Sequence, residues 1–160
     1  MDHEVYVVGV ISDTHGLLRP EVSTVFAGVD RILHAGDVGG AAVLAALSAI
    51  APVDAVYGNV DDSHDPALAR ERVVTIGGVT IHVSHGHELG RPTAALALTK
   101  YRSDIVVFGH THQALIERDG SGRVALNPGA AGPRRFDVRP SVARITIRNG
   151  VADTEIISLA

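Results

Sequence analysis

The chain has 160 residues, the usual size of one domain, and its 46% hydrophobic and 20% charged residues are typical of a folded protein. Its formal net charge of −4 and its only adjacent basic pair, Arg134-Arg135, argue against stable nucleic-acid binding, and the absence of cysteine excludes disulfides and thiolate metal ligands. Residues 1–4 lack the pattern of a signal peptide and no apolar run is long enough to span a membrane, so we expect one cytoplasmic domain over residues 1–160.

The first half of the chain alternates predicted strands with predicted helices. Short β-branched apolar runs indicate strands, and an Ala-rich stretch and a segment with proline in its first turn indicate helices. In chain order these are a strand at 5–11, a helix at 19–26, a strand at 31–35, a helix at 41–50 and a strand at 53–57. This β-α-β-α-β order favours a largely parallel sheet.

The second half is richer in hairpin signals. Gly77-Gly78 and Asn149-Gly150 are two-residue turns of the kind that joins antiparallel strands. The predicted elements are strands at 72–76 and 79–84, a helix at 93–101, and strands at 105–108, 115–118, 123–126, 142–148 and 151–157. The whole pattern predicts an α/β fold, a layered sandwich of two mixed β-sheets flanked by helices.

Side chains that can bind metals recur where the predicted strands end. In open α/β sheets, ligand sites collect beyond the carboxyl ends of the strands. Imidazole, carboxylate and amide groups without thiolate suit a borderline divalent ion, and seven donors are too many for one such ion. Two ions that share a carboxylate could clamp both the attacking and the leaving oxygen of a displacement. The candidate donors are Asp13, His15, Asp37, Asn59, His85, His110 and His112.

The order of these motifs is similar to that of a known family. Asp-x-His, Gly-Asp, Gly-Asn-x-Asp, His-Gly-His and Gly-His-x-His, each after a predicted strand, resemble the calcineurin-like metallophosphoesterases. The resemblance runs from Val5 to about Gly129. The short chain, the Gly58-Asn59-Val60-Asp61 segment and the Asn127-Pro128-Gly129-Ala130 segment are most similar to the small YfcE-type phosphodiesterases.

This resemblance implies a role for each donor. The expected ligands are Asp13, His15 and His112 for one divalent metal, Asn59, His85 and His110 for the other, and Asp37 as the bridge between them. Mn²⁺ is favoured over Fe, Co, Ni or Zn. A metal-bridging hydroxide would attack the phosphorus of a small phosphorylated substrate, with a diester favoured over a monoester. Asn59 could also stabilise charge on a phosphoryl oxygen.

Val60 is a departure from the family pattern. Many members carry a histidine at this position, where it helps to protonate the leaving group or to steady the transition state. A general acid is worth about 10²–10⁴-fold in rate. Its loss predicts either a preference for good leaving groups, such as those of aryl diesters, or help from His87 or His64. The candidate catalytic residues are therefore Asn59, Asp37 and His87.

Each candidate also has a simpler structural role. An aspartate beside a helix start often caps the helix, and an asparagine after a strand is common in turns. Two histidines at alternating positions could form a structural pair on a solvated face, and a single histidine in a loop needs no function. These alternatives apply in turn to Asp13 and Asp37, to Asn59, to His110 and His112, and to His87.

Several polar residues outside the motifs also have two interpretations. His34 could support a ligand from beside the second predicted strand, whereas we interpret His3 and His82 as structural. For Asp61 and Asp62, helix capping is favoured over ligand orientation. For Arg134, Arg135 and Arg139, a solvated surface charge is favoured over substrate contact.

Two other functions compete with metal-dependent hydrolysis at two ions. A eukaryotic retromer subunit resembles this fold, serves mainly as a protein-interaction scaffold and departs from the metal pattern at its Asp-x-His motif. The intact Asp13-Thr14-His15 motif favours catalysis here. A hydrolase or storage domain with a single metal is a third interpretation. The apolar carboxy-terminal hairpins leave a homo-oligomer open, because they could form either a dimer surface or ordinary core.

Overall fold

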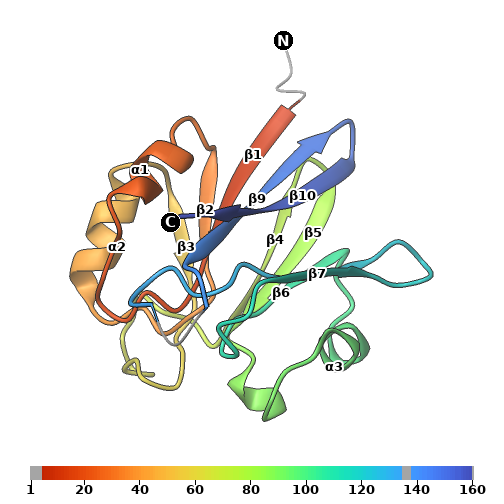
Figure 1. Ribbon diagram of the computed structural model, residues 1–160. Helices are drawn as coiled ribbons and strands as arrows, with labels where there is room; N and C mark the ends of the chain where they lie inside the picture. Colours follow the sequence, from red (N-terminus) through yellow and green to blue (C-terminus); the bar gives the residue numbers. More distant parts are fainter. Residues whose placement is uncertain (1–4, 135–137, 160) are drawn as a thin grey trace.

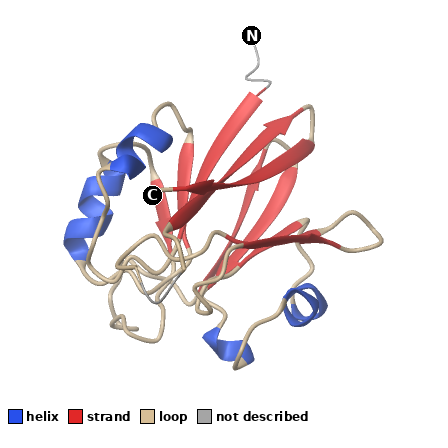
Figure 2. Ribbon diagram, viewed as in Figure 1, coloured by secondary structure: helices blue, strands red, loops and turns tan. Residues whose placement is uncertain are grey.

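The computed structural model describes residues 5–134 and 138–159, and His3 and Arg135 lie outside these ranges. Within them, two five-stranded sheets face each other and short helices lie on their outer sides (Figures 1 and 2). The predicted layered α/β sandwich is therefore confirmed. The described helices include none that is long and apolar enough to cross a membrane.

The first sheet joins the amino-terminal strands to the carboxy-terminal hairpin. Its strand order is β10-β9-β1-β2-β3. Strands β1, β2 and β3 are parallel, as the alternating pattern predicted, and the hairpin pairs antiparallel with β1. The bounds are β1 Val5–Ile11, β2 Arg31–His34, β3 Val53–Ala55, β9 Ser141–Arg148 and β10 Val151–Ser158.

The second sheet has the order β4-β5-β6-β8-β7. Two hairpins, β4-β5 and β7-β8, flank the parallel strands β5, β6 and β8. Both sheets are thus mixed, because parallel crossovers and antiparallel hairpins share each of them. The bounds are β4 Glu71–Ile76, β5 Val79–Ser84, β6 Ile105–Val107, β7 Leu115–Arg118 and β8 Val124–Asn127.

The helices cover the outer faces of the two sheets. Helices α1 (Glu21–Val25) and α2 (Ala41–Ser48) pack on the first sheet, and α3 (Ala94–Lys100) packs on the second (Figure 2). A short 3₁₀ helix, η1 (His87–Leu89), follows β5 directly. The three α-helices each bury a small apolar face: Val22 in α1, Val43 and Leu47 in α2, and Ala94 and Ala97 in α3.

Strand β1 shows how the layers are built. Val8 and Val10 are buried between the two sheets, whereas Ile11 lies in the other layer with Phe26 and Leu47. Side chains alternate across a strand, so one apolar run without polar interruptions serves both layers. Each fully buried aliphatic side chain contributes about 1.5–3 kcal/mol, which makes this strand a principal stabilising element.

The helices are shorter than their sequence patterns predicted because their flanking residues act as caps. The prediction of 19–26 becomes α1, with Pro20 as its N-cap residue. Thr93, predicted within a helix, precedes α3 as an extended N-cap whose hydroxyl accepts a hydrogen bond from the Leu96 N–H. The third strand also ends early, at Ala55, because Val56 forms only an isolated bridge to Ala69.

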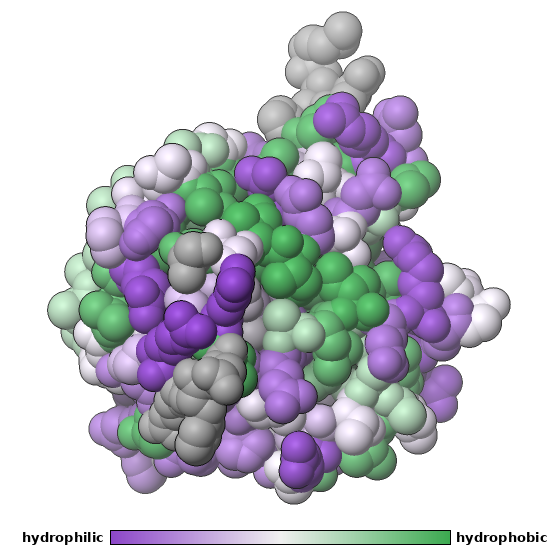
Figure 3. All heavy atoms as spheres, viewed as in Figure 1, coloured by the Kyte–Doolittle hydropathy of each residue, from purple (hydrophilic) through white to green (hydrophobic). Residues whose placement is uncertain are grey.

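One face of the molecule carries apolar surface between hydrophilic regions, as Figure 3 shows. Strand β10 runs along this face and exposes 36% of Ile156, while the facing residues of β9, such as Ile145, are fully buried. The apolar residues of β9 are therefore core, whereas β10 leaves Val151 and Ile156 at the surface. An association between chains through this surface stays a prediction.

Candidate metal centre

Five of the seven candidate donors converge at the carboxyl ends of the strands. Asp13 Oδ1 lies 3.2 Å from His112 Nε2 and 3.8 Å from both His15 Nε2 and His85 Nε2. Asp37 Oδ2 lies 3.3 Å from His85 Nε2 and 3.7 Å from His15 Nε2. These atoms come from the loops after β1, β2, β5 and β6, so both sheets contribute to one cluster.

The cluster divides into two overlapping groups of potential ligands. Asp13, His15 and His112 form one group, and Asp13, Asp37 and His85 form the other, each with its ligand atoms within 4.8 Å of one another. The first group is the predicted ligand set of one metal. The second contains the predicted bridge, Asp37, but it also shows that Asp13 stands between the two groups.

The other two donors lie at the edge of the cluster. The His110 ring is 5.1 Å from the His85 ring, centroid to centroid, beside the second group. Asn59 is solvent-exposed, and within the described contacts its side chain is not joined to the other six donors. Its loop is held at the site by the backbone, because the Val60 N–H donates to Asp37 Oδ1 at 3.1 Å.

Both carboxylates have one oxygen occupied by the protein and one facing the cluster. Asp13 Oδ2 accepts hydrogen bonds from the Ser12 hydroxyl at 2.5 Å and from the His110 N–H at 3.2 Å. Its Oδ1 is buried without a hydrogen-bond partner. Asp37 Oδ1 accepts the Val60 N–H, which leaves Oδ2 beside His15 and His85. The carboxylates are thus oriented before any ion binds.

His85 is oriented in the same way. Its Nδ1 lies 2.8 Å from the Ala35 carbonyl oxygen and donates to it, which places the lone pair on Nε2. That Nε2 is also buried without a hydrogen-bond partner, 3.8 Å from Asp13 Oδ1. Unsatisfied buried polar atoms are rare in native proteins. Two unsatisfied atoms, Asp13 Oδ1 and His85 Nε2, face each other at 3.8 Å, and a divalent cation bound between them would satisfy both.

The backbone of the cluster is strained. Asp13, His15, Asp37, His110 and His112 all have positive φ, between 48° and 69°, and among the described non-glycine residues only Asn149 shares this conformation. A left-handed backbone costs a residue with a Cβ about 1–2 kcal/mol. Such strain persists only where the surrounding structure fixes the conformation, and it clusters at functional sites.

Two glycines allow the close packing of these loops. A Cβ on Gly58 would overlap Asp37 Oδ1, and a Cβ on Gly109 would overlap the Ser12 hydroxyl and crowd Asp13 Oδ2. Glycine is therefore required at both positions for the carboxylates to keep their orientation. The sequence pattern placed these glycines beside the donors, and the structure gives the reason.

Charges within the cluster shift the pKa values of its members. Burial alone would raise the pKa of Asp37, but the neighbouring His85 ring, whose Nε2 lies 3.3 Å from Asp37 Oδ2, lowers it to about 2. Burial acts against the charged form of His85 as well, yet Asp37 and Asp13 raise the pKa of His85. Burial and the neighbouring His85 lower the pKa of His110. The metal-free site therefore keeps Asp37 ionised and His110 neutral, as ligands must be.

His34 supports the site from behind. Its Nδ1 accepts the Gly36 N–H at 3.1 Å, and its Nε2 lies 3.0 Å from the Thr14 hydroxyl, which donates to the Val38 carbonyl at 2.7 Å. Burial lowers the pKa of His34 to about 4, so the ring is neutral and donates from Nε2. These bonds connect the loops that carry Asp13 and Asp37, which supports the interpretation of His34 as ligand support.

The prediction that Asp61 and Asp62 cap a helix is wrong. Asp61 accepts hydrogen bonds from the backbone N–H groups of Val38, Gly39 and Gly58. Asp62 Oδ1 accepts the His64 N–H at 2.9 Å in a local turn. The described residues between β3 and β4 form turns, so there is no helix start for either carboxylate to cap.

Sequence reasoning missed the role of Asn127. Its side-chain N–H₂ donates to the Gly109 carbonyl at 3.2 Å and to the Thr111 hydroxyl at 3.1 Å, and its oxygen accepts the Gly129 N–H at 2.9 Å. Asn127 thereby fixes the loop that carries His110 and His112. The available signal was an asparagine directly after a predicted apolar strand, and in the structure this residue is fully buried.

Of the two histidines considered as leaving-group acids, His87 is the one near the cluster. Its ring centroid is 5.4 Å from that of His85 and 6.3 Å from that of His110, and its buried Nδ1 lacks a hydrogen-bond partner. The His64 side chain is 94% exposed. His82 stacks on Tyr101 at 3.7 Å and pairs with Glu71, which confirms its structural role.

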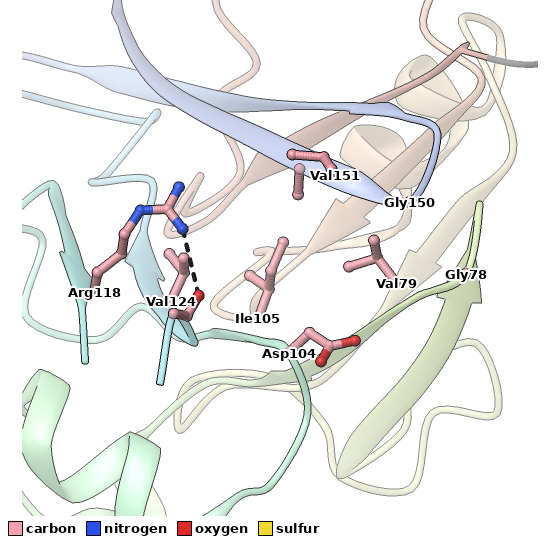
Figure 4. A pocket seen from close by; sticks show the side chains of 10 residues that line it. Gly78, Val79, Asp104, Ile105, Arg118, Val124, Gly150 and Val151 are labelled. Atoms are coloured by element: carbon pink, nitrogen blue, oxygen red, sulfur yellow. Dashed lines mark hydrogen bonds between the residues drawn. The ribbon is translucent and has the colours of Figure 1, made fainter. Parts of the chain in front are cut away.

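The opposite end of the sandwich has a cleft of about 400 Å³ that is lined by the first residues of β5, β6, β8 and β10 (Figure 4). Its walls combine polar and apolar surface, and its two charged residues are Asp104 and Arg118. Asp104 accepts hydrogen bonds from Thr80, and Arg118 donates to the Gly122 carbonyl at 3.3 Å. This cleft has no group of metal ligands, so the candidate chemistry lies at the other end.

The match to known proteins agrees with the geometry. Residues 7–150 match the model of the calcineurin-like phosphoesterase superfamily domain. A probable metallophosphoesterase of Methanothermobacter thermautotrophicus is 38% identical, over 94% of this chain and 91% of that protein. Another from Methanocaldococcus jannaschii is 32% identical, over 89% of this chain and 77% of that protein.

A solved structure, Vacuolar Protein Sorting 29 from Cryptosporidium parvum, superposes with a TM-score of 0.82 at 22% identity, over 99% of this chain and 100% of that one. At this identity the likeness is one of fold alone. The matching fold is the layered sandwich described above.

Proposed function

This chain belongs to the calcineurin-like phosphoesterase superfamily, and we propose that it is a dinuclear metal-dependent hydrolase that prefers phosphodiesters to phosphomonoesters. The family implies divalent metal ions. The observation that carries the proposal is the pair of unsatisfied buried atoms, Asp13 Oδ1 and His85 Nε2, which face each other among further ligands.

The donors fit two ions that share a carboxylate. One ion would be held by Asp13, His15 and His112, the other by Asn59, His85 and His110, with Asp37 Oδ2 available to both. Mn²⁺ is our first choice, because the set combines hard oxygen donors with imidazole. When bound, such a pair supplies Lewis-acid polarisation of a phosphate ester and activates water near neutral pH.

The residues of this chain have defined tasks around that chemistry. The two carboxylates bring negative charge to a buried site, and the hydrogen bonds of Asp13 Oδ2 and Asp37 Oδ1 fix the orientation of the free oxygens. The exposed Asn59 amide would donate to a phosphoryl oxygen of a substrate that approaches from solvent. A small substrate suits the site, because the net charge of the chain is −4 and offers no basic surface.

Protonation of the leaving group falls to His87 in this proposal. Val60 cannot carry a proton, and its side chain is 56% exposed beside Asn59. His87 stands next to the second ligand group and has an unpaired ring nitrogen, Nδ1. Because His87 replaces a histidine that the family usually carries at position 60, esters with good leaving groups should react fastest.

The direct test is reconstitution of the metal-free protein with Mn²⁺, Fe²⁺, Co²⁺, Ni²⁺ or Zn²⁺. Bound metal is counted by mass spectrometry, and turnover is measured on matched aryl phosphate monoesters and diesters. We expect two ions per chain and metal-dependent hydrolysis that is faster for the diester. Absence of turnover with every metal, together with metal-independent binding of a protein partner, would instead support a scaffold of this fold.

A second measurement tests the leaving-group argument. Aryl diesters with graded leaving-group pKa should show a steep dependence of kcat/KM on that pKa, and His87→Gln should make the dependence steeper. A dependence that His87→Gln leaves unchanged would contradict the role of His87, and a flat dependence in both proteins would contradict the leaving-group argument as a whole.

A further inference from the structure

One carboxylate outside the ligand set joins two loops of the site. Asp61 Oδ2 accepts the N–H groups of Val38 at 3.0 Å and Gly58 at 2.9 Å, and Asp61 Oδ1 accepts the Gly39 N–H at 3.0 Å. Val38 and Gly39 follow Asp37 directly in the chain. The side chain therefore reaches 22 and 23 residues back along the chain, from the loop after β3 to the loop after β2.

The connection also runs in the opposite direction. Asp37 Oδ1 accepts the Val60 N–H, which lies next to Asp61 in sequence. Each loop thus holds the other by a carboxylate bonded to backbone amides. Because Oδ1 of Asp37 is fixed by this contact, the direction of its Oδ2 toward His15 and His85 depends on where the neighbouring loop lies.

The hydrogen bonds of Asp61 distinguish between helix capping and ligand orientation. Both of its oxygens are engaged by backbone N–H groups, so it does not belong to either group of potential metal ligands. The described chain around it has no helix start to cap. A carboxylate that accepts backbone N–H groups makes charge-assisted hydrogen bonds, which are stronger and more directional than neutral ones.

We propose that Asp61 is a positioning residue, whose carboxylate holds the loop of Asp37 against the loop of Asn59 and so fixes the geometry of the shared metal ligand. The expected effect of Asp61 on turnover rests on the proposed function. Its expected effect on metal affinity does not. Removal of such a supporting partner typically costs about 10–100-fold in metal affinity or activity.

The sharpest variant is Asp61→Asn, because it changes one oxygen into an N–H₂ group at constant size. In either orientation of the amide, that group meets at least one of the three backbone donors. The matched control is Asp62→Asn, the same change at the next residue, whose exposed side chain bonds only within its own turn to His64.

We expect Asp61→Asn to raise the Kd for Mn²⁺ by about 10–100-fold in calorimetric titration of the metal-free protein, and to lower kcat at saturating Mn²⁺. Asp62→Asn should change either quantity by less than about twofold, as surface substitutions do. A merely structural role predicts the opposite pattern for Asp61→Asn, namely a lower Tm with unchanged Mn²⁺ affinity of the folded protein, and that result would overturn the inference.

Amide hydrogen exchange in the wild-type, metal-free protein tests the inference even where the variant fails to fold. The amides of Val38, Gly39 and Gly58 should be protected, and in folded Asp61→Asn they should exchange faster. Exchange of all three at the rate of exposed loop amides in the wild type would refute it. Wild-type protein that binds two Mn²⁺ ions but hydrolyses no ester would refute the proposed function. The role of Asp61 would still be tested by the Mn²⁺ affinity and amide exchange of the two variants.

Discussion

The two ends of the sandwich use the same unusual backbone conformation in opposite ways. At the hairpin end, positive φ falls on Gly77, Gly78, Asn149 and Gly150, residues that adopt it with little or no strain. At the end that carries the candidate metal ligands, it falls on five aspartate and histidine residues as well as on glycines such as Gly36 and Gly86, and a residue with a Cβ adopts it less readily than glycine. The turns were thus built from residues that suit the geometry, whereas the site keeps strained residues for their chemistry.

This difference shows where stability has been given up for function. The left-handed conformation costs a residue with a Cβ up to about 1–2 kcal/mol, against a usual domain stability of about 5–15 kcal/mol. The hydrogen bonds of Ser12, His34, Asp61 and Asn127 hold the loops in this conformation. The metal end is therefore a rigid, preformed site, and the following changes test that contrast.

The largest effect is expected from loss of the shared ligand. Asp37→Ala should lower kcat of the Mn²⁺-loaded protein by more than about 10³-fold, because it removes a charge on which both ions depend. Asn149→Ala, at the hairpin end, should leave kcat unchanged. Steady-state kinetics on an aryl diester provide the measurement, and circular dichroism verifies that both variants fold. Near-normal kcat in Asp37→Ala would refute its assignment as the shared ligand.

A smaller effect concerns the response of stability to pH through His34. Its pKa is lowered from 6.5 to about 4 in the folded chain, so below pH 6.5 the unfolded chain takes up a proton that the folded chain refuses. The stability provided by neutral His34 is complete above pH 6.5 and is lost as the pH falls toward 4, by about 3 kcal/mol in total.

Urea unfolding of the metal-free protein between pH 4 and pH 7 measures this slope. His34→Gln should be less stable at pH 7 yet lose less stability on acidification. Other groups, including His85 with its raised pKa, titrate in both proteins, so the difference between the two curves isolates His34. Parallel curves would mean that His34 is not held neutral.

The smallest effect concerns the strain itself. At His112, with φ of 63°, replacement by glycine should give a metal-free protein about 1 kcal/mol more stable than replacement by alanine, although neither variant should turn over substrate. The expected difference in Tm is about 2–4 °C for a chain of this size. Equal Tm values for the two variants would indicate that the backbone at His112 is relaxed.

The contrast between the ends also marks what the sequence could predict. Strand runs such as Val5–Ile11 and turns such as Asn149-Gly150 are local signals, and the structure confirms both. The fold class followed from their order. Helix ends were less accurate, because Thr93 has the composition of a helix residue but acts as a cap.

At the site, the donors were predicted because each follows a strand, yet their support was not. Asp61 and Asn127 act through backbone groups of loops that are distant in sequence, and their residue types are equally common in caps and turns. Long-range contacts of this kind have no local pattern. The exposed position of the Asn59 side chain likewise depends on how its loop packs.

The origin of the donors in both sheets has a consequence for how the protein matures during synthesis. Asp13, His15 and Asp37 come from the first sheet, and His85, His110 and His112 come from the second, while β9 and β10, made last, complete the first sheet beside β1. A ribosome-bound chain would therefore have only part of its ligand set until both sheets can close. We therefore expect metal uptake only after the two sheets have packed together.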